Sequence, residues 1–300
     1  MPRRIIIDTD PGIDDAVAIL LALASPELDV LGLVAVAGNL PLGVTELNAR
    51  ALAELAGRPE IPVHAGCPRP MSPAAVSAAH VHGDGGLGGL ALPEPKVAPQ
   101  PEHGVDFLVR KLREAKPKSI TLCALGPLTN IAVALVMAPQ IADRIQELVL
   151  MGGAARIPGN ITPAAEFNIH CDPQAAAVVF ESGVPITMAP LDVTQALRCT
   201  PEQRAPFSRL ASRCGGACAT LLGQMVAMHD PCVVAWLIAP QLFQGSEARV
   251  TVETQSALTM GMTLVDFRRR NGRPANARVL ESVDADGFFG LLAERIARLP

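Results

Sequence analysis

The sequence predicts an α/β fold: a single domain with a mostly parallel, open, Rossmann-like sheet and helices on both faces. Short apolar segments alternate with amphipathic ones along the 300 residues, which is typical of strands joined by helical crossovers. The expected strands are almost wholly apolar, as strands buried on both faces usually are. No linker interrupts the alternation, so we expect one domain over residues 1–300.

The expected elements follow one another in a regular order. Strands at Arg4–Thr9 and Val30–Ala37 are each followed by a helix, at Asp14–Ala24 and Leu42–Ala56; the second helix ends at Gly57, a good C-terminal stop. After a Pro-rich surface loop the alternation resumes, with helices at Val105–Ala115, Leu128–Ala138 and Pro173–Ser182, strands at Ser119–Leu125, Glu147–Met151 and Pro185–Pro190, and a last helix from about Ala285. The stretch Thr200–Ala227 receives no assignment.

Composition excludes several classes of protein. Hydrophobic residues make up 49% of the chain and charged residues 18%, so a large core can be buried. The net charge is −4, and the densest basic cluster, at residues 268–270, is too short for a nucleic-acid surface. The longest unbroken aliphatic run near the start, residues 16–24, is far shorter than the roughly 20 residues of a membrane span. We expect neither a nucleic-acid partner nor a membrane span.

The cysteines and the amino terminus favour the cytoplasm. Seven cysteines, an odd number without a CxxC pair, suit a reduced cytosolic protein better than a disulfide framework. Cys214 and Cys218 could lie one helical turn apart, but burial explains them more simply than zinc. Arg3 and Arg4 precede a short strand that ends in acidic residues, which does not fit a signal peptide.

An acidic loop is the strongest chemical signal. Its carboxylates, Asp8, Asp10, Asp14 and Asp15, follow an apolar strand and precede an apolar helix. We therefore place them at the carboxyl end of a strand, where open α/β sheets bind ligands. Helix capping would explain one of Asp14 or Asp15 but not all four, because crowded carboxylates repel one another. A hard cation such as Ca²⁺, which binds roughly six to eight oxygens, would neutralise them.

The string DTDPGIDDAVA, residues 8–18, resembles the amino-terminal signature of the inosine-uridine-preferring nucleoside hydrolase family. Further motifs similar to that family follow in order: AGN at 37–39, HGDGGLG at 82–88, LGPLTNIA at 125–132, MGG at 151–153, N-x₅-E-x-N at 160–168 and HDP at 229–231. One such match would be weak. Seven collinear matches over nearly the whole chain make the resemblance specific.

The resemblance implies an enzyme that uses Ca²⁺ and water to cleave the N-glycosidic bond of ribonucleosides. Asp10, Asp15 and Asp230, with the backbone carbonyl of Leu125, would hold the ion. Asp10 would also be the general base toward the water. Three carboxylates around a dication leave a charge of about −1, which suits a ribose that becomes an oxocarbenium cation. A homodimer or homotetramer is also implied.

The resemblance further implies which residues contact the substrate. Two roles concern the sugar: Asp14, Asn39 and Asn168 would bond the ribose hydroxyls, and Asn160 and Glu166 would bond the 5′-hydroxyl. Met151 would offer an apolar contact near the sugar, and His82, on a Gly-rich loop, would lie near the nucleobase. His229 would help to protonate the departing base, a task for which a group titrating near neutrality is suited.

Ordinary structural roles stand beside several of these functional ones. Asp230 precedes a proline, the favoured first residue of a helix, and could be a helix N-cap. Met151 would be equally natural in the core of a strand, and Asn160 in a turn. Trp236, the sole tryptophan, is expected in the core rather than against a base. Asp8 receives no contact.

The chain departs from some relatives in having no tyrosine. Relatives that act on pyrimidine nucleosides can use tyrosines from a segment shortly before the HDP motif. Here that segment offers apolar contact and an amide but no aromatic stacking, through Leu221, Leu222, Gln224, Met225 and Met228. The sequence indicates no preferred base, and weak stacking would place more of the burden on His229 or His82.

Two other functions compete with nucleoside hydrolysis. A phosphatase with Asp8 or Asp10 as nucleophile would need a later lysine and an acidic pair in matching context, which the sequence lacks. A catalytically silent nucleoside-binding protein would have no need of a general base, so the intact Asp10 and His229 argue against it.

Overall fold

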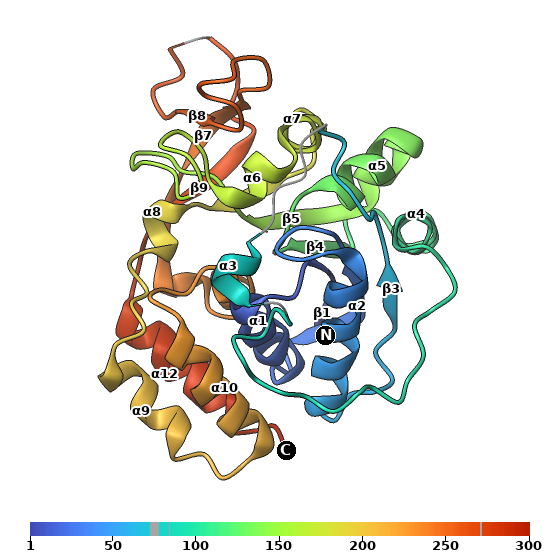
Figure 1. Ribbon diagram of the computed structural model, residues 1–300. Coiled ribbons are helices and arrows are strands. Elements are labelled where there is room, and N and C mark those ends of the chain that lie inside the picture. Colours follow the sequence, from blue (N-terminus) through green and yellow to red (C-terminus); the bar gives the residue numbers. More distant parts are fainter. Residues whose placement is uncertain (73–77, 84, 271) are drawn as a thin grey trace.

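The computed structural model describes residues 1–72, 78–83, 85–270 and 272–300. One sheet of nine strands runs through it in the order β3-β2-β1-β4-β5-β6-β9-β7-β8 (Figure 1). The strands are β1 (Arg3–Thr9), β2 (Leu28–Ala35), β3 (Val63–Ala65), β4 (Ile120–Ala124), β5 (Ile145–Met151), β6 (Ile186–Ala189), β7 (Phe243–Val252), β8 (Thr263–Asp266) and β9 (Ala277–Val283). The seven strands β3, β2, β1, β4, β5, β6 and β9 are each parallel to the next. β7 is antiparallel to both of its neighbours, β9 and β8.

Helices cover both faces of the sheet, as predicted. Successive residues of a strand point to opposite faces, so Ile5 and Ile7 enter one core while Ile6 enters the other. The first core is closed by α1 (Ile13–Leu23), α2 (Leu42–Leu55), α10 (Arg213–Gln224), α11 (Pro231–Ile238) and α12 (Ala285–Ile296). The second is closed by α4 (Gly104–Glu114), α5 (Thr129–Met137) and α7 (Pro173–Phe180). The predicted α/β fold with its mostly parallel sheet is confirmed.

The order of the strands explains where a ligand can bind. From β1 the chain moves outward to β2 and β3, then returns to place β4 on the other side of β1. Crossovers that diverge in this way leave a crevice at the carboxyl ends of the two central strands. The acidic loop leaves β1 at this point and Leu125 leaves β4. The N–H of Leu125 donates to the carbonyl of Asp8 at 2.8 Å, which fixes the two strand ends together.

Several elements lie outside the sequence prediction. The unassigned stretch after Thr200 contains α9 (Pro201–Ser208) and α10, and three short helices are α3 (Ala79–His82), α6 (Phe167–Cys171) and α8 (Leu191–Thr194). Two 3-10 helices span Pro139–Arg144 and Pro240–Leu242. Strands β3, β7, β8 and β9 were not predicted either. β3 has only three residues, and β7 is half exposed, so neither forms the apolar run of a buried strand.

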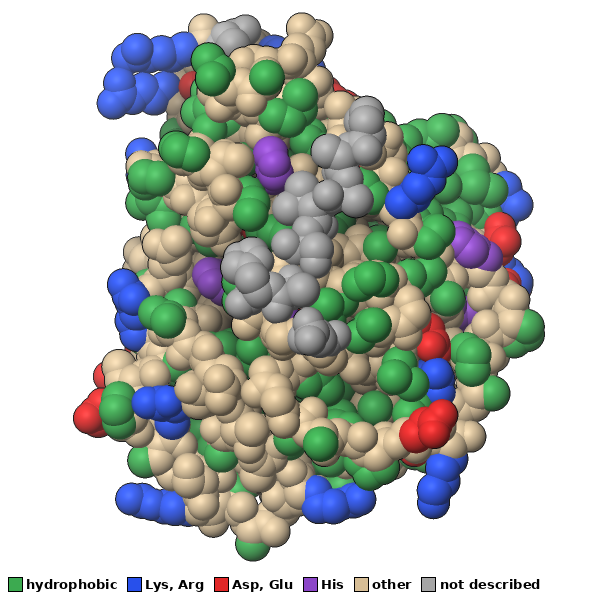
Figure 2. Space-filling model, viewed as in Figure 1, with side chains coloured by type: hydrophobic (Ala, Val, Ile, Leu, Met, Phe, Trp, Pro, Cys, Tyr) green, Lys and Arg blue, Asp and Glu red, His purple; other side chains and the backbone are tan. Residues whose placement is uncertain are grey.

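The cysteines, the tryptophan and the surface charges complete the description of the fold. All seven cysteines are free, and Cys214 and Cys218 are buried in α10. Trp236 is partly buried and packs edge-on against Phe243, with its Nε1 donating to Glu147 at 3.2 Å. No helix in the described part of the chain is long and apolar enough to cross a membrane. On the face shown in Figure 2, Lys and Arg side chains lie in small groups near the edge rather than in one continuous basic surface.

Candidate active site

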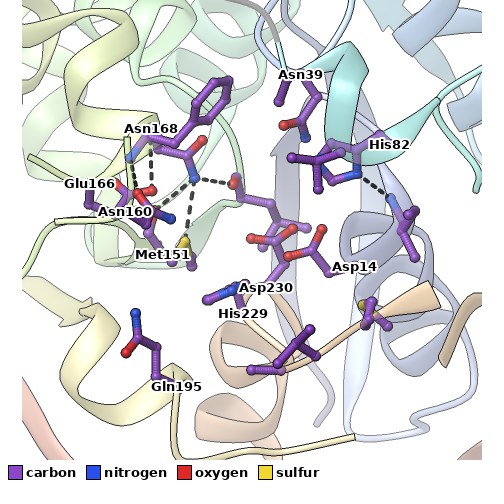
Figure 3. Close-up of a pocket in the computed structure, with 18 of the residues that line it drawn as sticks. Asp14, Asn39, His82, Met151, Asn160, Glu166, Asn168, Gln195, His229 and Asp230 are labelled. Atoms are coloured by element: carbon purple, nitrogen blue, oxygen red, sulfur yellow. Dashed lines mark hydrogen bonds between the residues drawn. The ribbon is translucent and has the colours of Figure 1, made fainter. Parts of the chain in front are cut away.

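A cavity of about 480 Å³ opens at the carboxyl edge of the sheet, beside the crevice between β1 and β4. Asp14, Asp230 and His229 lie together in Figure 3, with Asn39 and His82 on one side and Met151, Asn160, Glu166 and Asn168 on the other. Leu125 also lines it. The cavity therefore brings together every predicted substrate and catalytic residue except Asp10, and Asp10 and Asp15 lie beneath it, fully buried.

Three carboxylates cluster at the base of the cavity, where Asp14 and Asp230 line it and Asp15 lies beneath. One oxygen from each of Asp14, Asp15 and Asp230 lies within 4.8 Å of the other two, and all three residues are buried. Burial raises the pKa of the Asp230 carboxyl well above its usual range, and the negative charges of Asp14 and Asp15 raise it further. Hard oxygen donors crowded in this way fit a divalent cation, so this buried acidic triad could hold a metal ion.

Helix geometry explains part of this arrangement. Asp15 accepts the backbone N–H of Gly12 at 3.0 Å and the Thr9 hydroxyl at 2.6 Å, so it does cap α1. Asp230 stands at the N-cap position of α11, yet its side chain makes no capping hydrogen bond. The capping explanation thus holds for Asp15 and fails for Asp230. The amino ends of α1 and α11 both face the triad, and their dipoles favour negative charge there.

Asp10 is held apart from the triad by close backbone packing. Its Oδ2 accepts the backbone N–H of Asn39 at 2.6 Å, whereas its Oδ1 is buried without a hydrogen-bond partner. A Cβ at Gly126 would stand 2.3 Å from that Oδ1, and one at Gly38 would stand 2.1 Å from Oδ2. Only glycine allows this approach. Burial, followed by the charge of Asp15, raises the pKa of the Asp10 carboxyl.

Asn39 links Asp10 to the acidic triad. Its side-chain amide donates to the carbonyl oxygen of Asp10 and to Oδ2 of Asp15, both at 3.2 Å.

Asp8, for which the sequence predicted no contact, points to the face of the sheet that α5 covers. Its carboxylate accepts a hydrogen bond from the side chain of Asn130 in α5 at 2.9 Å. Burial raises the pKa of Asp8 to about 8. It supports the strand end and lies outside the cavity.

Asn168 joins the ends of β4 and β5. Its Nδ2 donates to the Leu125 carbonyl at 2.7 Å and to the Met151 carbonyl at 3.2 Å, and lies 3.5 Å from the Met151 sulfur. The Leu125 carbonyl therefore has one hydrogen bond and one further lone pair to offer. Met151 ends β5, is buried in the strand core and also lines the cavity; its contact with the sugar stays a prediction.

Glu166 and Asn160 hold the loop that follows β5. Glu166 is the N-cap of α6 and accepts the backbone N–H groups of Asn168, Gly153 and Ile169 at 2.8–3.1 Å. Burial raises its pKa to about 7. Asn160 is exposed and accepts the N–H of Phe167 at 2.9 Å, which closes the loop over the cavity.

The two histidines reach the cavity from different segments. Nδ1 of His82 accepts the N–H of Ile13 at 3.0 Å, so a neutral His82 carries its hydrogen on Nε2. Asp84 of the same motif lies outside the described residues. Nδ1 of His229 lies 2.8 Å from the hydroxyl of Thr194. Burial lowers the pKa of His229, and the charge of Asp14 opposes this effect.

Some cavity residues were not found from the sequence. Gln195 and Arg198, which follow α8, line the cavity but belong to no motif. In the segment before the HDP motif, Gln224 and Met225 line the cavity, whereas the neighbouring Leu221, Leu222 and Met228 are fully buried in the core. α10 ends at Gln224, so helical periodicity could not have separated Met225 at the cavity from Met228 in the core.

Comparison with known proteins decides the family. The model of the family described as inosine-uridine preferring nucleoside hydrolase matches residues 5–290. This chain belongs to that family. The protein is therefore a nucleoside hydrolase, an enzyme that hydrolyses N-glycosyl compounds.

Individual relatives of this nucleoside hydrolase carry different names. An uncharacterized protein of Schizosaccharomyces pombe is 46% identical, covering 99% of this chain and 100% of its own. The pyrimidine-specific ribonucleoside hydrolase RihA of Shewanella sp. (strain ANA-3) is 44% identical, covering 99% and 97%. The solved purine-preferring ribonucleoside hydrolase from Gardnerella vaginalis is 32% identical with a TM-score of 0.92, covering 98% of both chains.

Proposed function

We propose that this hydrolase cleaves ribonucleosides to ribose and free nucleobase with Asp10 as general base and His229 assisting the leaving base. The observation that carries the proposal is the buried, unpartnered Oδ1 of Asp10 beneath the cavity that Asp14, Asp230 and His229 line. A buried carboxylate oxygen without a donor is costly. A water molecule or a cation would supply the missing partner.

The resident ion in this proposal is Ca²⁺, held by Asp10, Asp15, Asp230 and the carbonyl of Leu125. Every donor is a hard oxygen, which is the set that Ca²⁺ prefers. Asp14 is the third member of the triad in place of Asp10, so its carboxylate lies close enough to take part as well. When bound, the ion would offset the crowded negative charge and hold ribose hydroxyls and a water for reaction.

The chain's own residues would carry out the remaining steps. Asp10 takes a proton from water as the water oxygen bonds to C1′ of the ribose. The C1′–N bond breaks with its electron pair going to the base, and an N–H of His229 supplies the proton that the base needs. The buried carboxylates favour the positive charge that develops on the ribose during this exchange.

The other residues would orient the sugar and the base. Asp14, Asn39 and Asn168 are proposed partners of the ribose hydroxyls, since their polar groups face the cavity close to the triad (Figure 3). Asn160 and Glu166 are proposed to bind the 5′-hydroxyl from the loop after β5. Met151 would contact the sugar and His82 the base, with its Nε2–H free to donate.

The assembly and the location of the enzyme are also proposals. A homodimer or homotetramer is proposed from the family resemblance, and light scattering tests it. A cytoplasmic location is proposed on the seven free cysteines, which an oxidising compartment would tend to pair.

A product assay tests the proposed reaction. The protein is incubated with Ca²⁺ and, separately, with inosine, uridine, cytidine, adenosine and guanosine, and free ribose is measured. Release of ribose from at least one nucleoside supports the proposal. Tight nucleoside binding by calorimetry without any ribose release would instead indicate a silent binding protein and overturn it.

A further inference from the structure

The side chain of Thr194 contacts a residue that the proposed reaction depends on. Thr194 is the last residue of α8 and is fully buried, and its Oγ1 lies 2.8 Å from Nδ1 of His229. A hydroxyl can accept from an N–H or donate to a bare nitrogen, so this contact can persist in either charge state of the ring. It leaves Nε2 as the ring nitrogen that can meet a substrate.

The backbone also fixes Thr194 relative to His229. Just after α8 the carbonyl of Leu197 accepts the N–H of Met228 at 3.0 Å, and the N–H of Cys199 donates to Val226 at 3.0 Å. These two bonds form a short ladder between the chain that follows Thr194 and the chain that precedes His229. The distance between the two side chains is therefore set by local backbone pairing.

The other end of α8 is fixed to the loop after β5. The N–H of Leu191 donates to the carbonyl of Gly153 at 2.9 Å, and the carboxylate of Asp192 accepts the N–H groups of Ala155 and Arg156 at 2.7 and 2.8 Å. Helix α8 thus connects the two segments that would hold the 5′-hydroxyl and the leaving base. Gln195, the residue after Thr194, reaches the cavity wall in Figure 3.

We propose that Thr194 is a positioning residue that orients His229 so that Nε2 donates to the departing nucleobase. This inference rests on the proposed function of His229. In the step it serves, the proton on Nε2 moves to the base as the C1′–N bond breaks, while Nδ1–H continues to donate to the Thr194 hydroxyl. The ring carries a hydrogen on both nitrogens before this step and keeps only Nδ1–H after it, so Thr194 can hold it in one orientation throughout. Without the hydroxyl the ring can turn, and Nε2–H then no longer points at the base.

Two substitutions at Thr194 distinguish the effect of its hydroxyl from the effect of its side-chain shape. Thr194→Val keeps the volume and branching but removes the hydroxyl, whereas Thr194→Ser keeps the hydroxyl. Thr187→Val is the matched control, because it removes another buried hydroxyl, bonded to Glu147, from the strand that leads into α8. Each variant is assayed with a good nucleoside substrate and with 4-nitrophenyl riboside, whose leaving group departs as a stable anion without a proton.

The inference predicts a selective loss. With the nucleoside, kcat of Thr194→Val falls on the order of 10-fold or more, part of the ~10²–10⁴-fold that general acid–base catalysis contributes. With 4-nitrophenyl riboside the same variant stays close to the wild type, and Thr194→Ser and Thr187→Val stay close with both substrates. Added to His229→Ala, Thr194→Val causes no further selective loss, because both changes remove the same function.

Other results would overturn the inference in distinguishable ways. If His229→Ala selectively slows the nucleoside and Thr194→Val does not, Thr194 has no positioning role and the proposed function stands. If His229→Ala slows both substrates equally, the leaving-base role fails and the inference fails with it. An equal loss on both substrates for Thr194→Val, with a weakened fold seen in thermal unfolding, assigns Thr194 a structural role only. Thr194→Ala repeats the comparison if the valine variant does not fold.

Discussion

The backbone N–H of Asn39 donates to Oδ2 of Asp10 at 2.6 Å and leaves Oδ1 of the same carboxylate buried without a partner. The protein thus holds one oxygen by a hydrogen bond, and the other is the oxygen for which we propose a catalytic role. The Cα of Gly126 faces that second oxygen so closely that no side chain fits between them.

Gly126→Ala is expected to disable the enzyme by displacing Asp10. The added Cβ would stand 2.3 Å from Oδ1, so the carboxylate has to move, and kcat should fall by about 10²-fold or more, as loss of a positioned general base does. Gly43→Ala is the control, since a Cβ there meets nothing within 4 Å. It should keep full activity and gain about 0.5–1 kcal/mol of stability in α2. Equal activity of the two variants would contradict this role for Asp10.

Removal of the metal should abolish activity and lower stability. A chelator is expected to stop ribose release, and Ca²⁺ at about 100 times its Kd should add about 2.7 kcal/mol to the free energy of unfolding. Asp230→Asn should weaken Ca²⁺ binding measured by calorimetry. Full activity in chelator would show that the triad works without an ion.

Asp14 distinguishes two versions of the metal site. If Asp14 binds only the ribose, Asp14→Asn raises KM and leaves the Kd for Ca²⁺ unchanged. If it is a ligand, as its place in the triad allows, the Kd for Ca²⁺ rises even without nucleoside. We expect the first result, because Asp10, Asp15 and Asp230 already supply three carboxylates to the proposed metal site. Calorimetry with and without substrate decides, and Asp106→Asn, at an exposed position of α4, is the charge-matched control.

The fold should lose stability in mild acid partly through His64. This ring is 3% exposed, stacks on Phe107 at 4.0 Å and donates from Nδ1 to the carbonyl of Glu102. Burial lowers its pKa below the usual 6.5, so the folded protein favours the neutral ring. Its contribution is complete above pH 6.5 and is lost as the pH falls from 6.5 toward the folded pKa.

His64→Asn removes this titration and keeps a side-chain donor. The free energy of unfolding of the variant, measured in chelator at pH 7.5 and 5.5, should change less between the two pH values than that of the wild type. An identical pH dependence in both proteins would rule out this contribution from His64.

The sequence located best those cavity residues that are close together in the chain. Asp14 and Asp15 follow a strand and open a helix, so their place at the carboxyl edge of the sheet follows from the fold class. Asp230 lies far along the chain, and only the family motif connected it to them. Thr194 carries no such mark, because a buried threonine in a one-turn helix is common and its partner His229 lies 35 residues away.

The elements that were missed have weak or mixed patterns. α9 contains a proline at position 206, and α10 has two adjacent glycines, at 215 and 216, in its first turn, so neither has the composition of a strong helix former. β7 and β9 form the antiparallel edge region of the sheet, where one face is exposed and the apolar run of a buried strand is absent. In these regions tertiary packing selects the structure.

The role of Asp10 as general base is tested by the ribose release of Asp10→Asn, compared with that of the wild type in Ca²⁺ and the best nucleoside of the panel. The amide keeps the size of the carboxylate but cannot accept the proton from water. If Asp10 is the general base, kcat should fall by about 10²–10⁴-fold in a variant that still folds. A variant as active as the wild type would contradict it.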